Sequence, residues 1–135
     1  MYEIKPYIGV GDIEFGMDGE KVCSIMGNEY RRIDNQYTPG FRLCFPQMHI
    51  FFDDNNCCNA IEGNILSGFY YKDIQIAGKP FKIIKKIFEE FDDNMDINQD
   101  GFTSYKLGIG VYVPTLKKSK NELIQGVIVF KEGYF

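Results

Sequence analysis

The feature that most constrains the fold is an internal repeat. The segment Asp12–Met26 aligns without a gap on Asp73–Ile87, which lies 61 residues further along the chain. In this alignment Val22 is matched by Ile83, while Gly16-Met17 is matched by Ala77-Gly78. A register kept over so many residues indicates two related units, because repeated units bury their apolar faces against each other.

The same spacing extends into the second part of each unit. Residues 50–52 align with 111–113, and five additional residues then increase the spacing to 66, so that 60–61 align with 126–127. The length of 135 residues is that of an ordinary domain. We therefore expect one domain over residues 1–135, with pseudo-repeat units at about 7–66 and 68–135.

One short and one longer helix are predicted, one in each unit. Asp18 is a favourable N-cap, and Gly27 is a typical residue at a helix end. In the second unit Pro80 suits the start of a helix. Apolar residues then recur at helical spacing at positions 81, 84, 87, 88 and 91, which predicts a long buried face.

Strands follow each helix. Residues 41–52 and 57–66 flank the turn-forming segment Asp53–Asn56, which predicts a hairpin. Residues 107–113 alternate apolar side chains with Gly108 and Gly110, so one face of that strand is nearly bare, and another part of the chain is expected close to it. The predicted fold class is α+β, an antiparallel sheet with helices on one face, made of two degenerate helix-plus-β-hairpin units.

Charge and composition exclude several function classes. A net charge of −4 disfavours nucleic-acid binding, since phosphate contacts need a basic face. No apolar run of about 18 residues and no signal-peptide pattern occurs, so we expect a cytoplasmic protein that does not bind membranes. Nothing in the sequence points to an oxidising compartment, so reduced thiols are expected at four positions: Cys23, Cys44, Cys57 and Cys58.

Catalytic and cofactor motifs are not found. His49 is the only histidine, so any cysteine- or serine-dependent triad would have to use it, and no nucleophile elbow or phosphate loop accompanies it. The four cysteines contain no CxxC pair for zinc. The sequence therefore predicts a protein that is not an enzyme, with a structural or surface histidine, no metal and no cofactor.

The candidate binding site is the acidic segment 89–100, which contains six acids and no base. The second helix carries lysines early and acids late, the reverse of what the helix dipole favours, so local stability does not explain the pattern. A solvated helix face remains the alternative. The functional hypothesis is that this segment binds a protein partner with a basic surface. The candidate partner-binding residues are Glu89, Glu90, Asp92, Asp93, Asp96 and Asp100.

A calcium-binding module is the alternative function. Asp96, Asn98, Asp100 and Gly101 match the first positions of an EF-hand loop. The twelfth position is Leu107, where a bidentate glutamate is required, and Asp-Gly is also a common hairpin turn. A turn is therefore favoured over a metal site.

The opening of the first unit carries a family resemblance. Ile13-Glu14-Phe15-Gly16-Met17, followed by Val22 and Met26-Gly27, resembles the opening of the β-lactamase-inhibitor-like and small outer-membrane lipoprotein repeat, a helix-plus-sheet unit. It also resembles small bacterial immunity-type proteins of toxin systems, whose second half is similar to residues 100–114 and whose closing strand is similar to 126–135. This resemblance implies a protein-binding role, with a cognate toxin as partner. It assigns no binding residue.

Overall fold

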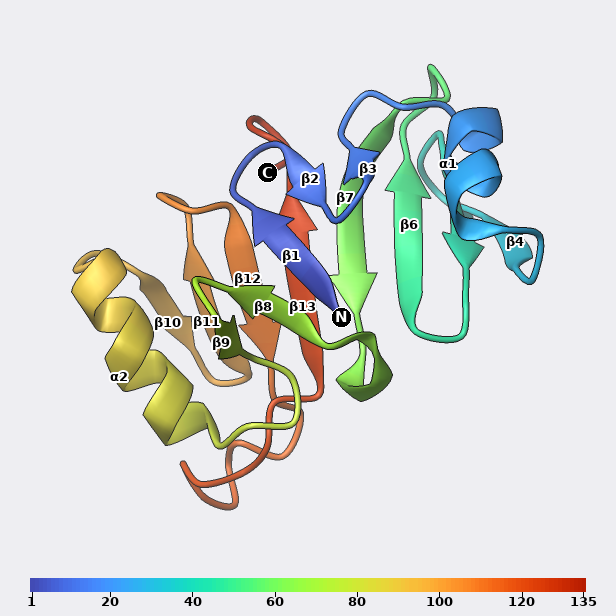
Figure 1. Ribbon diagram of the computed structural model, residues 1–135. Coiled ribbons are helices and arrows are strands. Elements are labelled where there is room, and N and C mark those ends of the chain that lie inside the picture. Colours follow the sequence, from blue (N-terminus) through green and yellow to red (C-terminus); the bar gives the residue numbers. More distant parts are fainter.

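The computed structural model describes residues 1–135 and contains two β-sheets, two α-helices and one short 3-10 helix (Figure 1). In chain order the elements are β1 (Tyr2–Lys5), β2 (Gly9–Val10), β3 (Ile13–Glu14), α1 (Gly19–Met26), β4 (Arg31–Asp34), β5 (Phe41–Cys44), β6 (Met48–Phe52), β7 (Cys58–Gly63), η1 (Ile65–Ser67), β8 (Phe69–Tyr71), β9 (Ile74–Gln75), α2 (Phe81–Phe91), β10 (Asp96–Asn98), β11 (Gly101–Ser104), β12 (Ile109–Tyr112) and β13 (Gly126–Phe130).

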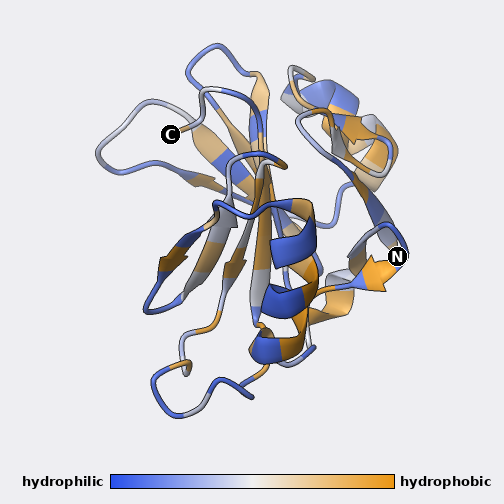
Figure 2. Cartoon of the chain, turned by 90° about the vertical axis from the view of Figure 1, so that its left-hand side faces the viewer, coloured by the Kyte–Doolittle hydropathy of each residue, from blue (hydrophilic) through white to orange (hydrophobic).

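The larger sheet has eight strands in the order β10-β11-β12-β13-β7-β6-β5-β4, and all its neighbours are antiparallel. The smaller sheet, β3-β2-β1-β8-β9, lies with α1 and α2 on one face of the larger sheet (Figures 1 and 2). The predicted α+β class and the antiparallel sheet with helices on one face are confirmed. No helix is both long enough and apolar enough to cross a bilayer.

Strand pairing confirms the repeat residue by residue. In the first unit Met48 pairs with Gly63, and in the second Ile109 pairs with Val129, so the spacings of 61 and 66 hold across both hairpins. The last strands of the two units, β7 and β13, pair antiparallel at the centre of the sheet. Glu62 and Ile128, which are equivalent residues, face each other there. A pseudo-two-fold axis therefore passes between them.

The smaller sheet follows the same axis. The β2–β3 hairpin pairs Val10 with Ile13, and the β8–β9 hairpin pairs Tyr71 with Ile74, again 61 residues apart. Strand β1 runs between the hairpins, antiparallel to β2 and parallel to β8. It has no counterpart in the second unit, so β1 is an addition that joins the two hairpins into one sheet.

The predicted register is wrong by one residue in the helices. Val22 of α1 is fully buried, but its predicted match Ile83 is 55 % exposed, and the buried residue of α2 is Ile84. The spacing changes just before the helices, where the N–H of Gly16 donates to Cys58 and that of Gly78 donates to Ile124. Gly16 is thus matched by Gly78, both with positive φ, and Ala77 is the inserted residue.

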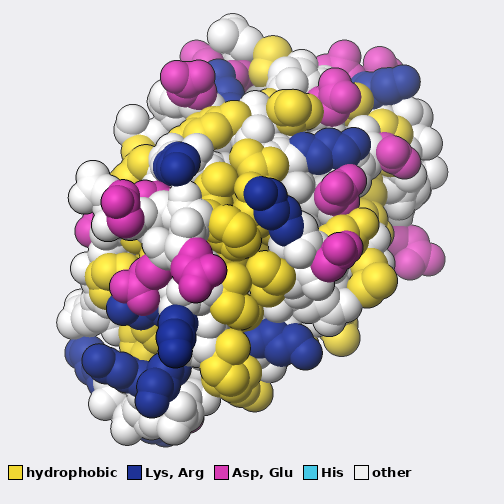
Figure 3. Space-filling model, turned by 60° about the vertical axis from the view of Figure 1, so that its left-hand side comes forward, with side chains coloured by type: hydrophobic (Ala, Val, Ile, Leu, Met, Phe, Trp, Pro, Cys, Tyr) yellow, Lys and Arg dark blue, Asp and Glu magenta, His cyan; other side chains and the backbone are white.

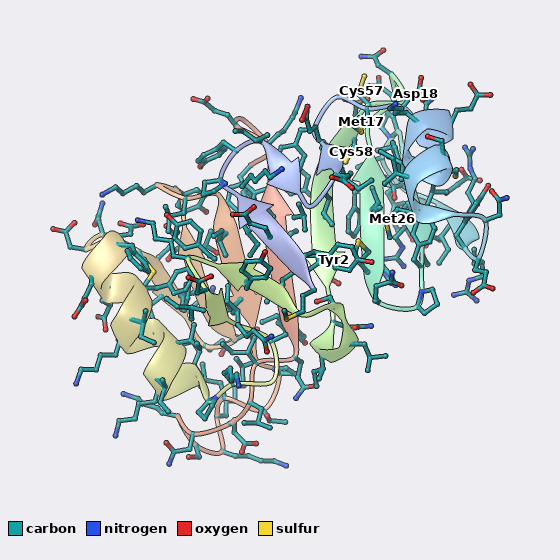
Figure 4. The ribbon with its side chains drawn as sticks, in the orientation of Figure 1. Tyr2, Met17, Asp18, Met26, Cys57 and Cys58 are labelled. Atoms are coloured by element: carbon teal, nitrogen blue, oxygen red, sulfur yellow. The ribbon has the colours of Figure 1, made fainter.

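The same segment anchors α1. The backbone N–H of Cys58 donates to the carbonyl of Met17, and the two residues lie next to each other beside the start of the helix (Figure 4). Asp18 accepts from the N–H of Lys21 at 2.8 Å, and Gly27 ends the helix with φ 92°, as the sequence predicts. Because the N–H of Gly16 also donates to the carbonyl of Cys58, two backbone hydrogen bonds hold the segment before the helix against β7.

A single buried cluster of 24 residues fills the space between the layers and draws on both units. The predicted apolar face of α2 is confirmed: Phe81, Ile84 and Phe88 are buried, while positions 87 and 91 are partly buried against the cluster. Phe88 and Phe81 lie with ring centroids 5.4 and 5.9 Å from that of Phe102 on β11. Aromatic contacts of this kind fix α2 on its half of the sheet.

The two bare glycines meet different neighbours. A Cβ at Gly108 would lie 3.0 Å from the ring of Tyr7, which comes from the β1–β2 turn. Gly110 lies between the side chains of Thr103 and Ile128 on adjacent strands, and its Cβ would lie 3.0 Å from Ile128. The expected close approach is therefore made by a turn and by neighbouring strands, and no helix covers these positions.

Candidate functional site

Four of the six predicted acidic residues form an exposed group at one corner of the molecule. Glu89 and Glu90 lie on the last turn of α2, Asp93 follows that helix, and Asp96 begins the edge strand β10. We call these four residues the acidic corner. One ion pair reaches it, from Lys85 to Glu89 at 3.3 Å. Figure 3 shows the segregation on this side, with lysines gathered at the lower end and carboxylates above them.

Asp92 does not belong to this surface, which corrects the prediction. Its side chain is 5 % exposed, and its carboxylate accepts from the Ser104 hydroxyl at 2.7 Å and from the N–H of Asn94 at 2.9 Å. Burial alone would raise the pKa of Asp92, but these bonds, with the backbone and charge of Lys106, hold it below the ordinary value. Asp92 is a structural anchor for the end of α2.

Asp100 is also separated from the corner. Asn98 pairs with Gly101 in a tight β10–β11 hairpin, so Asp100 lies in the turn at the opposite end of β10 from Asp96. The side chain of Asn98 accepts from the N–H of Asp100 at 2.8 Å, which is an Asx turn. The DxNxDG segment is therefore a hairpin, and no group of three or more acidic, cysteine or histidine side chains is placed to hold a metal ion.

The acidic corner borders an uncovered surface. The face of the eight-stranded sheet opposite the smaller sheet and the helices, which we call the outer face, carries neither helix nor sheet (Figure 2). Cross-strand pairing aligns one residue from each strand in a row across it: Asp96, Thr103, Gly110, Ile128, Glu62, His49, Cys44 and Arg31. The row starts with an acid at β10 and ends with a base at β4.

His49 stands in the middle of this row, paired with Cys44 on one side and Glu62 on the other. Neither neighbour makes a hydrogen bond or ion pair with the imidazole within the structure. Burial lowers the pKa of His49, the positive charge of Arg42 lowers it further, and Glu62 opposes both. The neutral form of the imidazole is therefore favoured, and no nucleophile is bonded to it.

All four cysteines are free thiols. Cys23, Cys44 and Cys57 are partly exposed, whereas Cys58 is buried. Burial raises the pKa of Cys58 to about 12, so this thiol stays protonated and unreactive.

The sequence prediction missed a groove between α1 and the inner side of β4 and β5. It has a volume of about 860 Å³, and we call it the α1 groove. Its lining residues are Gly19, Glu20, Cys23, Ser24, Gly27, Asn28, Tyr30, Arg32, Phe41, Leu43 and Asn56. The signal was the pairing of Gly19 with the large Phe81, which the one-residue error in the helix alignment concealed.

One wall of the α1 groove is an ordered stack. The guanidinium carbon of Arg32 lies 3.9 Å from the ring centroid of Phe41, whose other side stacks on Phe52 at 4.7 Å. Arg32 also pairs with Asp34 at 3.0 Å. Its charge is thus already matched by a neighbouring carboxylate on the same strand.

Comparison with protein-family models, with curated proteins and with solved structures found no match.

Proposed function

We propose that the protein is a non-catalytic binding protein of the immunity type, which neutralises a toxin by holding a basic surface of that partner against the acidic corner. The observation that carries the proposal is the set of exposed carboxylates from two different elements, α2 and β10, with one lysine paired among them. The corner also borders the outer face, which offers an extended surface for the rest of an interface.

The placement of these charges supports the proposal. Glu89 and Glu90 lie at the carboxyl end of α2, where the helix dipole disfavours negative charge by a few tenths of a kcal/mol per charge. Such a cost is expected where charge serves association, since complementary potentials steer a partner and raise its rate of encounter. The side chains of the outer face fit the same role, because Arg42, Phe51 and Tyr112 are of types enriched in protein interfaces.

The proposal is tested by charge reversal. The tagged protein is used to capture its partner from the native host, and the association rate of the purified pair is then measured at low salt. We expect the triple variant Glu90→Lys, Asp93→Lys, Asp96→Lys to associate about tenfold or more slowly, because electrostatic steering is lost.

A matched control carries the same change in net charge elsewhere. Glu3, Glu14 and Glu132 are exposed, and changing all three to lysine should alter the association rate by less than about twofold. Equal association rates for the two triple variants would contradict the assignment of the acidic corner as the partner-binding surface. Failure to capture any stoichiometric partner would count against the binding function itself.

A further inference from the structure

The internal repeat allows the α1 groove to be compared with its own counterpart in the second unit. Gly19, Cys23 and Arg32 of the groove correspond to Phe81, Lys85 and Ile97 around α2. Those three residues line a hollow of about 290 Å³, against about 860 Å³ for the α1 groove. The two sites are therefore equivalent positions, one largely filled and the other open.

Two side chains fill the second site. Phe81 occupies the position where α1 has only the hydrogen of Gly19. Leu116 comes from the longer β12–β13 connection and packs against the buried cluster beside Phe81. The first unit has the shorter β6–β7 connection and lacks both of these filling groups: the ring at the helix position of Phe81, and the aliphatic side chain that a loop supplies as Leu116.

The backbone shows the same difference. In the second unit the β12–β13 connection runs across the start of α2, where the N–H groups of Phe81 and Lys82 donate to the carbonyls of Glu122 and Lys120, both at 2.9 Å. In the first unit Gly19 donates to the side chain of Asn56 at 3.3 Å. The N–H of Glu20, which corresponds to Lys82, has no hydrogen-bond acceptor within the chain.

Charge defines what kind of segment fits. Glu20 lies on the groove, and a hollow that shares Arg32, Phe41 and Asn56 with it adds three carboxylates, from Asp34, Asp53 and Asp54. Arg32 is the one base of the wall and is already paired with Asp34. The rim is therefore acidic. The segment that fills the equivalent site, residues 115–120, has the complementary composition of one leucine and three lysines.

We propose that the α1 groove binds a basic segment of a partner protein, which inserts a leucine-type side chain beside Gly19 and places a backbone carbonyl against the N–H of Glu20. This deepens the proposed function, on which it rests for the existence of a protein partner. It adds a second contact, at the opposite end of the sheet from the acidic corner, and it specifies the partner chemistry as an aliphatic anchor flanked by lysines.

The experiment uses the full-length protein and a synthetic peptide, PTLKKSKN, which copies residues 114–121. Titration followed by amide NMR shifts should perturb residues at the start of α1 and along β4 and β5. A peptide with aspartate in place of its leucine should bind about tenfold or more weakly, because the buried apolar anchor is lost. No shifts up to about 1 mM peptide, or shifts centred elsewhere, would overturn the proposal.

Filling the groove gives the sharper test. The Gly19→Phe variant copies Phe81 and should weaken peptide binding about tenfold or more, whereas Gly19→Ala should retain it. A Cβ at Gly19 meets Asn56 at 3.4 Å and Phe41 at 3.8 Å, which are ordinary contacts. If Gly19→Phe fails to fold, Cys23→Lys copies Lys85 and should weaken binding through like charge. Binding that survives a folded groove-filling variant contradicts the proposal.

Peptide binding to the α1 groove and partner binding to the acidic corner can be tested independently. Peptide binding requires no captured partner, and the triple variant at Glu90, Asp93 and Asp96 should leave the peptide affinity within about twofold, since these residues lie on the other unit. Peptide binding without any captured partner would therefore leave the groove assigned and overturn the immunity-type function. A captured partner without peptide binding would support the immunity-type function and overturn the assignment of the groove.

Discussion

The hydroxyl of Ser104 on β11 donates to the carboxylate of Asp92 at 2.7 Å, and both side chains are buried. The bond joins the residue that follows α2 to the sheet strand on which the helix packs. It therefore explains why one acid of a strongly acidic segment is turned inward while its neighbour Asp93 stays exposed.

Removing this bond should destabilise the fold. Ser104→Ala leaves a buried carboxylate short of one donor, and we expect a loss of about 1.5–3 kcal/mol in the free energy of unfolding. Chemical denaturation at pH 7 measures it. Asp93→Asn, at the exposed neighbour, should change stability by less than about 0.5 kcal/mol. Similar small effects for both variants would contradict the anchoring role of Asp92.

The same pair predicts a pH dependence. The pKa of Asp92 is below its ordinary value in the folded state, so its stabilisation is fully present above the unfolded pKa of about 4 and is lost as pH falls through the folded pKa. Asp92→Asn should therefore flatten the acid side of the stability profile. Denaturant midpoints between about pH 2 and 6 check this, and a variant as acid-sensitive as the wild type would refute it.

Phe81 should contribute strongly to stability, whereas a substitution at Gly19 should have little effect on it. Phe81 is 2 % exposed and packs on Phe102, so Phe81→Ala should cost about 3–5 kcal/mol through the cavity it leaves. Gly19→Ala, at the equivalent helix position, should be neutral or slightly stabilising, because alanine is the better helix former. Thermal unfolding of the two variants side by side tests the comparison. Equal losses would contradict the conclusion that the site beside Gly19 is open while the equivalent site is filled by Phe81.

Three of the four cysteines should react with a thiol reagent in the native protein, and the fourth should not. Cys23, Cys44 and Cys57 are partly exposed and should react rapidly with a thiol reagent at pH 8, while Cys58, whose pKa is raised to about 12 by burial, should react only on unfolding. Mass spectrometry of the native protein counts the modified sites. Fast labelling of Cys58 in the native state would contradict its burial.

His49 should titrate below the ordinary histidine range. Its pKa is lowered by burial and by Arg42, so Arg42→Gln should raise the pKa, and Glu62→Gln should lower it further. Because the folded pKa is depressed, the stability contributed by the neutral imidazole is present above the unfolded pKa of about 6.5 and is lost as pH falls. NMR titration of the single imidazole measures these values directly. A lower pKa in Arg42→Gln, or a higher pKa in Glu62→Gln, would contradict the arrangement of the row.

Local patterns predicted much of the architecture. Period-two apolar residues, turn formers at Asp53–Asn56 and the cap at Asp18 act between near neighbours in the chain, and each forms the expected element. The repeat supplied the long-range part, since equivalent strands had to pair in equivalent registers. That is why the spacings of 61 and 66 survive in the sheet.

The errors arose where a distant segment decides the outcome. Ala77 is inserted between a strand and a helix, and sequence matching could not see it because Ile83 and Ile84 are both isoleucine. The burial of Asp92, which follows α2, depends on Ser104, which lies on β11. The α1 groove forms where helix, strands and a short connection meet in space, so no single stretch of sequence predicts it.

The pseudo-axis between Glu62 and Ile128 has a further consequence. Each unit contributes its last strand to the central pairing, and the two strands meet in the manner of an isologous interface between identical subunits. Two separate copies of one unit, related by the same rotation, would make the same kind of contact. The chain thus resembles a homodimer whose two subunits are joined by a linker. Covalent linkage allows the two halves to differ: the second unit packs its own β12–β13 loop into the site beside α2, and the first unit leaves the equivalent site open to a segment of another protein.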